Sequence, residues 1–353
     1  MDDRHQQTVE EEAEASISRF SITARNIFSI ALAVVMRPVS IIIYCYSVYD
    51  YMKSCLYSYA AWTVLSILLS MGITSLLYLN ILTAENVVSK PALEMDTFLE
   101  LLFSYFFRDG KTLFWAVKCN KAIERRKQDD VIEYYSKYVK EECNVGLIRL
   151  LDCFLESAPQ KILQLAIVFR DFASLTYYHS FTFCIYFGTI AWSLMSYNRL
   201  NRSAQLDKHD IKSRGLVAQF VFLLCFTVSR MLCIAFMART NPTHTLYFCI
   251  FHSLVCGTIV SIVDAPRFSG SLTINYIFCV AFGVVYLYIF TSLKEGPTRN
   301  KYIFYLILCV LENIAICALY VPLYYGIFIV FLYAIGIIIN ILYYVYWHPR
   351  ITA

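Results

Sequence analysis

Ten long stretches of apolar residues are the feature that most constrains what this chain can fold into. Each is about 20 residues long, the length that an α-helix needs to cross the hydrocarbon core of a bilayer. A spanning segment must also be helical, because lipid offers no partner to an unpaired backbone group. The stretches cover residues 27–49, 56–82, 97–117, 145–169, 173–197, 215–238, 245–263, 272–293, 302–323 and 325–346.

The composition agrees with a membrane protein. Hydrophobic residues make up 59% of the chain and charged residues 16%, whereas soluble domains average about 45–50% and about 25%. The sequence lacks the alternating pattern of a membrane β-barrel. It therefore predicts an all-α polytopic membrane protein. The net charge of +4 gives no sign of a nucleic-acid partner.

The distribution of Lys and Arg between the stretches predicts the orientation of the chain. The linkers 118–144, 198–214 and 294–301 are basic, and we expect all three on the cytosolic side. This requires two of the stretches to enter and leave the bilayer on the same side. We therefore predict about eight transmembrane helices plus two partial or re-entrant helices, with both termini cytosolic.

Two regions are candidates for the partial helices. The 97–117 stretch is interrupted by the charged residues 108–111, which would suit either a helical hairpin that dips into the membrane or an amphipathic helix lying flat. The other partial helix is either 245–263 or 272–293, and the sequence does not distinguish them.

The membrane domain is predicted to cover residues 25–346. Residues 1–24 are acidic and lack the basic start and apolar core of a secretory signal, so we expect a disordered cytosolic tail. Residues 347–353 are expected to form a short cytosolic C-terminal tail.

Several ionisable or polar residues lie within or at the end of apolar stretches. A charge at the centre of a bilayer costs about 2.5–3.5 kcal/mol on insertion scales, so these side chains must face protein or water. They form either internal salt bridges that hold helices together or a polar track for a charged solute or lipid headgroup. The residues are Asp50, Arg149, Asp152, Glu156, Lys161, Arg230, Glu312 and Asn313.

The fourth stretch is the most informative. Arg149, Asp152 and Glu156 are three and four residues apart and so share one helical face, with Pro159 and Gln160 just beyond. Pro159 predicts a helix kink, because proline removes a backbone donor. A carboxylate at this kink would hold a headgroup amine or a cation, or the kink is structural. Two nearby carboxylates repel, so we expect at least one to be protonated or paired with Arg149 or Arg230.

Signs of catalytic or metal chemistry are missing from the sequence. It contains no H-E-x-x-H, P-loop or G-x-S-x-G motif. The 13 Cys form no C-x-x-C pair, and His244 and His252 are isolated in the chain. We therefore expect no enzyme activity, no catalytic residue, no cofactor and no metal site.

The segment 147–170, with Phe154-Leu155-Glu156-Ser157-Ala158-Pro159-Gln160 at its core, resembles the signature of the XK-related (Xkr) family of phospholipid scramblases. Other matching segments follow in family order between about residues 44 and 320. They are Trp192-Ser193-Leu194-Met195-Ser196-Tyr197, Phe226-Thr227-Val228-Ser229-Arg230, Lys294-Glu295-Gly296-Pro297-Thr298-Arg299 and Leu311-Glu312-Asn313-Ile314-Ala315.

The resemblance implies eight spans with two re-entrant helices. It also implies ATP-independent movement of phosphatidylserine between leaflets, as in the removal of apoptotic cells at the plasma membrane. Acidic residues in the membrane are thought to form a headgroup path in this family. By position, that role falls to Asp152, Glu156 and Glu312, with Arg149 and Arg230 as counter-charges.

The sequence also departs from the family pattern. Many members have two Asp residues four apart in the first span, whereas here Asp50 is followed by Ser54. Members cut by caspases have a cytosolic tail with the cleavage site. The Asp-x-x-Asp tetrad of this chain is Asp207-Lys208-His209-Asp210 in a linker, so we expect no direct caspase control.

Two alternatives to a scramblase stay open at this point. A multi-span chemoreceptor or channel is also rich in Tyr and Phe, although the central helix with acidic residues and proline argues against it. A non-transporting family member would instead act as a membrane scaffold for a partner protein. The expected partners are phospholipids, phosphatidylserine above all, and either a single-span membrane protein or a second copy of the chain.

Overall fold

The structure is a computed structural model that describes residues 22, 24–84, 95–125, 127–170, 177–203, 211–291, 293 and 299–348. Within these residues every regular element is helical, which confirms the predicted all-α fold class. The elements are α2 (Ala24–Lys53), α3 (Tyr57–Ala84), α4 (Met95–Glu124), α5 (Gln128–Asp152), η1 (Cys153–Ser157), α6 (Ala158–Arg170), α7 (Tyr177–Ser203), α8 (Ser213–Thr240), α9 (Pro242–Val263), α10 (Leu272–Tyr286), α11 (Arg299–Tyr320), α12 (Leu323–Leu342) and η3 (Tyr343–Trp347).

Some predictions fall outside this description. The tetrad Asp207-Lys208-His209-Asp210 lies outside the described residues. Of the two predicted tails, 1–24 and 347–353, only residues 22, 24, 347 and 348 are described.

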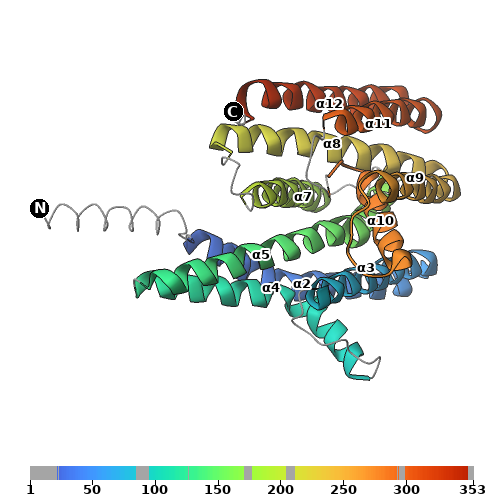
Figure 1. The fold of residues 1–353 in the computed structure, drawn as a ribbon. Coiled ribbons are helices and arrows are strands. Elements are labelled where there is room, and N and C mark those ends of the chain that lie inside the picture. Colours follow the sequence, from blue (N-terminus) through green and yellow to red (C-terminus); the bar gives the residue numbers. More distant parts are fainter. Residues whose placement is uncertain are drawn as a thin grey trace, which may run out of the picture.

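Two groups of helices are joined by one long helix (Figure 1). α2 and α3 pack on α4 and α4 on α5, whereas α6, α7, α11 and α12 pack against α8. α5, η1 and α6 follow one another without a break from Gln128 to Arg170. The first part of this long helix therefore contacts one group and its last part contacts the other.

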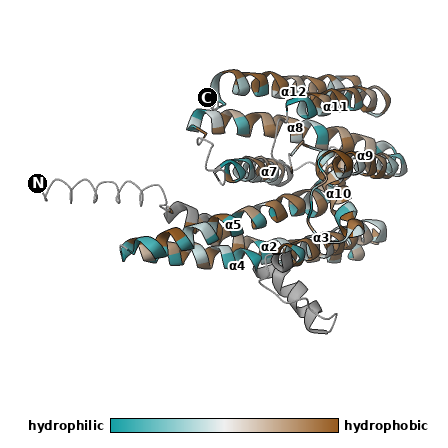
Figure 2. Cartoon of the chain, in the orientation of Figure 1, coloured by the Kyte–Doolittle hydropathy of each residue, from teal (hydrophilic) through white to brown (hydrophobic). Residues whose placement is uncertain are grey.

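Six helical segments are long and apolar enough to cross a membrane, judged by length and composition within the described residues. α8 is the central one, with 72% of its apolar window buried inside the protein, against 11% for α2. In Figure 2 hydrophobic residues dominate α9 and α12, while the end where α4 meets α5 is hydrophilic. The six segments are Ile30–Lys53, Tyr57–Ile81, Ser213–Thr240, Pro242–Val263, Arg299–Tyr320 and Leu323–Trp347.

The short helix α10 bears on the choice between the two candidate partial helices. It has 15 residues, against 22 for α9. At about 1.5 Å per residue α10 reaches about 22 Å, less than the hydrocarbon thickness of about 30 Å. Of the pair 245–263 and 272–293, helix length therefore favours the second as the predicted partial helix, since its helix ends at Tyr286.

Of the two alternatives for residues 97–117, the helical hairpin with a turn at residues 108–111 is wrong, and the amphipathic helix lying flat stays a prediction. α4 is continuous through these residues, and Arg108 and Asp109 are buried in the protein rather than exposed at a turn. The basic segment 118–144 is also mostly helical, because α4 extends to Glu124 and α5 begins at Gln128. Arg108, Asp109 and Lys111 are paired with side chains of α5, so the helix does not have to end at them.

A π-helical turn, η1, lies directly before Pro159. In it the backbone N–H of Ala158 bonds to the carbonyl of Cys153, five residues earlier. Proline has no N–H, and its ring crowds the carbonyl four residues before it. The wider π turn accommodates this, and such turns are frequent at functional sites. The sequence predicted a kink here, and the structure has a π turn inside a continuous helix.

Candidate functional site

A row of polar side chains follows one face of α5, η1 and α6. Apart from one adjacent pair, its members recur about one or two helical turns apart, so they line up along the helix. From the first to the last the row is about 28 Å long at 1.5 Å per residue, close to the hydrocarbon thickness of about 30 Å. We call it the polar row: Glu141, Glu142, Arg149, Asp152, Glu156 and Gln160.

Asp152 lies near the middle of the row and is bonded from three helices. Arg108 of α4 donates from Nη2 to its Oδ2, and Ser70 of α3 donates from Oγ to Oδ1 at 3.1 Å. The Nη2 atom of Arg37, on α2, lies 3.4 Å from Oδ1. The carboxylate is thereby fixed between α2, α3 and α4.

Glu156 is one turn further along and is fully buried, with an exposed fraction of 0%. Arg37 Nη2 donates to its Oε2 at 3.1 Å, and the hydroxyl of Tyr105 donates to the same oxygen at 2.7 Å. The guanidinium of Arg37 also lies over the Tyr105 ring, 4.1 Å from its centroid, a favourable cation–π distance. Arg37 therefore connects α2 to both carboxylates of the row.

Arg149 is bonded to Asp109 and to Glu142, toward the Glu141 end of the row. Its Nε donates to Asp109 Oδ1 at 2.7 Å, and its Nη1 donates to Glu142 Oε1 at 2.9 Å. The expectation that Asp152 or Glu156 pairs with Arg149 is therefore wrong, since both are bonded to Arg37 or Arg108 instead. Arginines on neighbouring helices are nearer to the two carboxylates than an arginine on the same helix face.

The two ends of the row are also bonded to neighbouring helices. Glu141 accepts from Lys111 Nζ at 2.9 Å and from the Tyr78 hydroxyl at 2.7 Å. At the other end, Thr63 Oγ1 donates to Gln160 Oε1 at 2.9 Å. The row is therefore bonded from end to end in this structure.

The helix α3 faces the row with a stripe of hydroxyl side chains that sequence reasoning missed. Residues three and four apart lie on one helical face, and such a spacing within an apolar stretch was the available signal. A buried hydroxyl supplies hydrogen bonds without a charge, so α3 stays apolar enough to span. The stripe is Tyr59, Thr63, Ser66, Ser70, Thr74 and Tyr78.

Sequence reasoning also missed the cations of the row. Arg37 was visible as an arginine inside the first apolar stretch, next to Pro38. Arg108 was assigned to a polar turn. Asp50 lies exposed near the end of α2, away from the row. Lys161 points elsewhere and donates to Gln164 at 2.9 Å.

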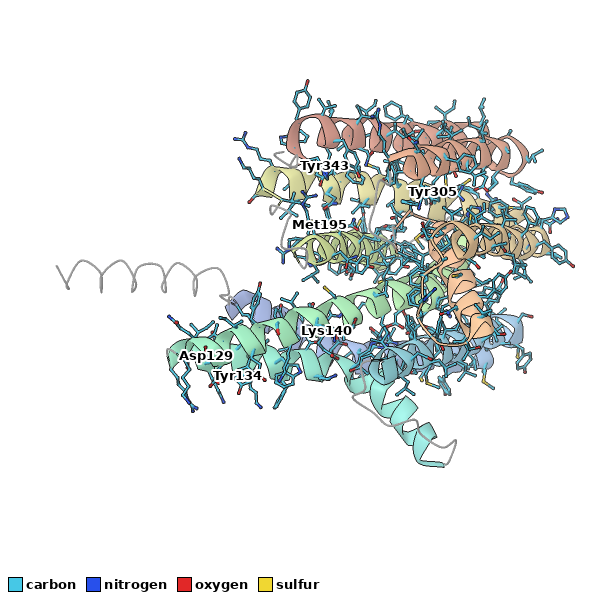
Figure 3. All side chains as sticks on the ribbon, in the orientation of Figure 1. Asp129, Tyr134, Lys140, Met195, Tyr305 and Tyr343 are labelled. Atoms are coloured by element: carbon cyan, nitrogen blue, oxygen red, sulfur yellow. The ribbon has the colours of Figure 1, made fainter. Side chains whose placement is uncertain are left out.

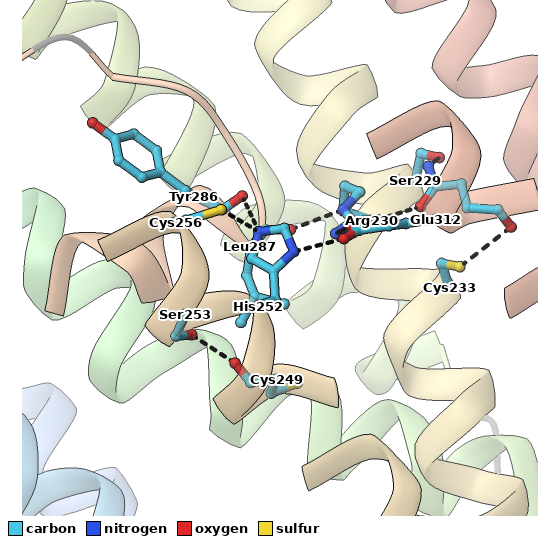
Figure 4. Close-up of polar contacts among 11 residues, drawn as sticks. Ser229, Arg230, Cys233, Cys249, His252, Ser253, Cys256, Tyr286, Leu287 and Glu312 are labelled. Carbon is cyan, nitrogen blue, oxygen red and sulfur yellow. Dashed lines mark hydrogen bonds and ion pairs between the residues drawn. The ribbon is translucent and has the colours of Figure 1, made fainter. Parts of the chain in front are cut away.

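Arg230 is the centre of a second network, in the other half of the protein (Figure 4). Its side chain is fully buried and makes three bonds. Nε donates to the carbonyl of Leu287, Nη1 to Asn313 Oδ1 and Nη2 to Glu312 Oε2, at 2.8, 2.8 and 2.7 Å. These bonds join α8 to α11 and to the segment after α10. The predicted pairing of Arg230 with Asp152 or Glu156 is wrong, because Glu312 occupies its ion-pairing side.

His252 of α9 completes this Arg230 network. Its Nδ1 lies 2.8 Å from Glu312 Oε1, and its Nε2 lies 3.1 Å from the carbonyl of Tyr286. The residue is isolated in the sequence, but the fold places it between Glu312 of α11 and the last residue of α10, Tyr286. The site residues Arg230, Glu312 and Asn313 are thus together, in a network separate from the polar row.

An aromatic contact connects the two networks. Phe154, between Asp152 and Glu156, stacks on Tyr288 with ring centroids 5.0 Å apart. Tyr288 directly follows Leu287, whose carbonyl accepts from Arg230. A displacement of η1 would therefore reach the Arg230 network through two buried rings.

Comparison with known proteins identifies the family. The sequence matches the XK-related protein family over residues 28–349. Its relatives include cell death abnormality protein 8 of Caenorhabditis elegans, 24% identical over 267 residues. The protein of the same name in Caenorhabditis briggsae is 24% identical over 262 residues. The alignments cover 70% and 67% of this chain, and they span only 57% of the length of each relative. Since the family match covers most of a chain that folds as an all-helical membrane protein, this protein belongs to the XK-related family.

Proposed function

We propose that this protein is an ATP-independent phospholipid scramblase that exposes phosphatidylserine at the surface of the plasma membrane. The XK-related family is not an enzyme family, and relatives are named for abnormal cell death. Scrambling needs no nucleophile or cofactor. It needs a route along which a polar headgroup crosses the hydrocarbon core.

The observation that carries the proposal is the length and chemistry of the polar row. The row extends over about the thickness of the hydrocarbon core. The buried side chains of the row and of its partners on α2 and α4 also keep polar atoms that no described group satisfies, among them Glu156 Oε1, Arg37 Nε and Arg108 Nε and Nη1. Free guanidinium donors suit a lipid phosphate, and a free carboxylate oxygen suits the amine of a headgroup.

The proposed route is closed in this structure, because the carboxylates and arginines of the row bind each other. α2 forms its outer wall, since 11% of its apolar window is buried. Arg37 attaches this wall to Asp152 and Glu156. Movement of α2 away from η1 would expose the row to lipid, and headgroup contacts would replace the ion pairs.

Reconstitution tests the proposal. The purified protein is placed in vesicles that contain fluorescent phosphatidylserine, and dithionite then bleaches the outer leaflet. We expect wild type to bring inner-leaflet label within reach of dithionite without ATP. The variant Arg37→Gln/Glu156→Gln should do so faster, because it removes the ion pair on α2 without leaving an unpaired charge.

Two controls accompany this experiment. Glu133→Gln/Lys137→Gln removes an exposed ion pair on α5 and should scramble at the wild-type rate. A soluble fluorophore trapped inside the vesicles should stay protected, which excludes leakage. If the inner-leaflet label survives in both wild type and Arg37→Gln/Glu156→Gln, the scramblase proposal is wrong and the scaffold alternative is favoured.

A further inference from the structure

A pocket lies where α4 and α5 meet, apart from the polar row and the Arg230 network. Its volume is about 570 Å³, within the range of small-molecule sites. Figure 3 labels Asp129, Tyr134 and Lys140 on this part of α5. The polar and aromatic lining consists of Phe114, Lys118, Lys121, Arg125, Asp130 and Tyr134.

The charge of the pocket is positive and uncompensated. Lys118, Lys121 and Arg125 have no carboxylate within 4.0 Å among the described residues. The only acidic residue in the lining is Asp130, and Lys127 lies 3.9 Å from it. Three cations therefore converge on one cavity with a single carboxylate among them.

The remaining lining is apolar. Leu113, Val117 and Ala122 form part of the wall, and Phe114 is 51% exposed. The Lys118 ammonium lies 4.4 Å from the centroid of the Phe114 ring. A cavity with cations beside exposed apolar surface suits a ligand that is both charged and lipidic.

The position of the pocket agrees with the level of lipid headgroups. Tyr134 precedes Glu141, the first residue of the polar row, by about 10 Å along the helix. Headgroup layers extend roughly 5–8 Å beyond the hydrocarbon core on each side. Gly110, whose neighbour Lys111 binds Glu141, lines the inner end of the pocket. The pocket therefore extends from the edge of the hydrocarbon core outward through the headgroup level of the leaflet on the α4–α5 side.

We infer that this pocket binds the headgroup of a membrane lipid that carries a phosphomonoester. Such a group has a charge of about −1.5 to −2 and three acceptor oxygens, which matches three cations offset by one carboxylate. A phosphodiester headgroup has one fewer charged oxygen to offer. Basic pockets between membrane helices bind phosphorylated inositol lipids in this way.

The bound headgroup would lie beside the part of α4 that contacts the polar row. Gly110 lines the pocket, and its neighbours Asp109 and Lys111 bind Arg149 and Glu141. An occupant thus adjoins the segment of α4 that closes the row. The binding itself does not depend on the proposed scrambling activity and is measured separately from it.

Native mass spectrometry of the full chain in detergent tests the inference. The probe is dioctanoyl phosphatidylinositol monophosphate, compared with dioctanoyl phosphatidylserine and with soluble inositol bisphosphate. We expect Lys118→Ala/Lys121→Ala/Arg125→Ala to bind the probe at least about tenfold more weakly, since each cation near an anionic lipid contributes roughly fivefold. Lys118→Arg/Lys121→Arg keeps the charge and should keep the binding.

A matched control removes three cations from the linker and the adjoining ends of α7 and α8. Arg199→Ala/Lys212→Ala/Arg214→Ala should bind the probe like wild type, because none of these residues lines the pocket. Equal weakening in both triple variants would overturn the inference in favour of general charge attraction. Phosphatidylserine bound as tightly as the probe would overturn the phosphomonoester requirement. Soluble inositol bisphosphate bound as tightly as the probe would overturn the lipid assignment.

Discussion

Glu156 has a single cation within 4.0 Å among the described residues, and this cation comes from the most exposed of the spanning helices. The cation is Arg37, whose side chain is 12% exposed. Asp152, by contrast, also keeps Arg108 and Ser70 as partners. Loss of Arg37 would therefore leave Glu156 as the buried charge with no cation, while Asp152 stays paired.

Arg37→Gln should lower the amount of protein at the cell surface. Breaking a buried pair by removing one partner costs about 3–5 kcal/mol, because the remaining charge is uncompensated. Adding Glu156→Gln should restore the surface level, since an amide pair of similar shape carries no charge. Surface biotinylation of both variants measures this. Equal loss in the single and double variants would show that Arg37 acts through contacts other than the ion pair.

At the scale of elements, α9 and α10 form the tightest helix pair. A Cβ on Gly283 would lie 2.0 Å from the carbonyl oxygen of Ser253, and a Cβ on Gly257 would lie 2.6 Å from the Cα of Val280. Ser253 and Gly257 are four residues apart on α9, and small residues at this spacing let membrane helices approach closely. The close approach also brings His252 to the carbonyl of Tyr286, so it supports the Arg230 network.

Gly283→Ala should destabilise the protein. The added methyl cannot fit against backbone, and overpacking of this kind costs about 1–3 kcal/mol or more. We expect a lower melting temperature in detergent, measured by intrinsic fluorescence. Gly72→Ala in α3 is the matched control, because nothing lies within 4 Å of its added Cβ. Equal melting temperatures for Gly283→Ala and Gly72→Ala would contradict the close packing.

At the scale of the whole molecule, the described helix ends next to the three basic segments lie at one end. The start of α8 meets the end of η3, where a Cβ on Gly215 would lie 3.3 Å from the Trp347 carbonyl oxygen. The start of α11 lies beside the last part of α12, with Asn340 Nδ2 3.4 Å from the Tyr302 hydroxyl. Figure 1 shows the α4–α5 link on this same side. From the positive-inside tendency we predict that this end faces the cytosol.

Tags at Met1 and Ala353 should therefore both be cytosolic, and the α2–α3 turn should be extracellular. Antibodies should detect either tag only after permeabilisation. Cys55, exposed in that turn, should react with an impermeant maleimide on intact cells, and Cys55→Ser should lose this labelling. Detection of a tag on intact cells, or labelling of Cys55 only after permeabilisation, would reverse the proposed orientation.

The sequence by itself determined the fold class and the approximate place of most long helices, although it predicted a linker for the part of α5 before residue 145. The reason is that a bilayer requires runs of about 20 apolar residues and pairs every backbone group inside its own helix. Both requirements are local and can be followed along the chain. The same local rule identified the charges within the membrane as unusual, and it singled out the face with Arg149, Asp152 and Glu156.

Only the tertiary structure decided which charges meet. An ion pair depends on a few ångströms between helices that are far apart in the chain, as Arg37 and Glu156 are. Helix packing also decided that Arg108 and Asp109 are buried within one continuous helix, because partners on α5 compensate their charges. A rule based on hydropathy along one segment treats such residues as a break. Such a rule does not account for partner residues that another helix supplies.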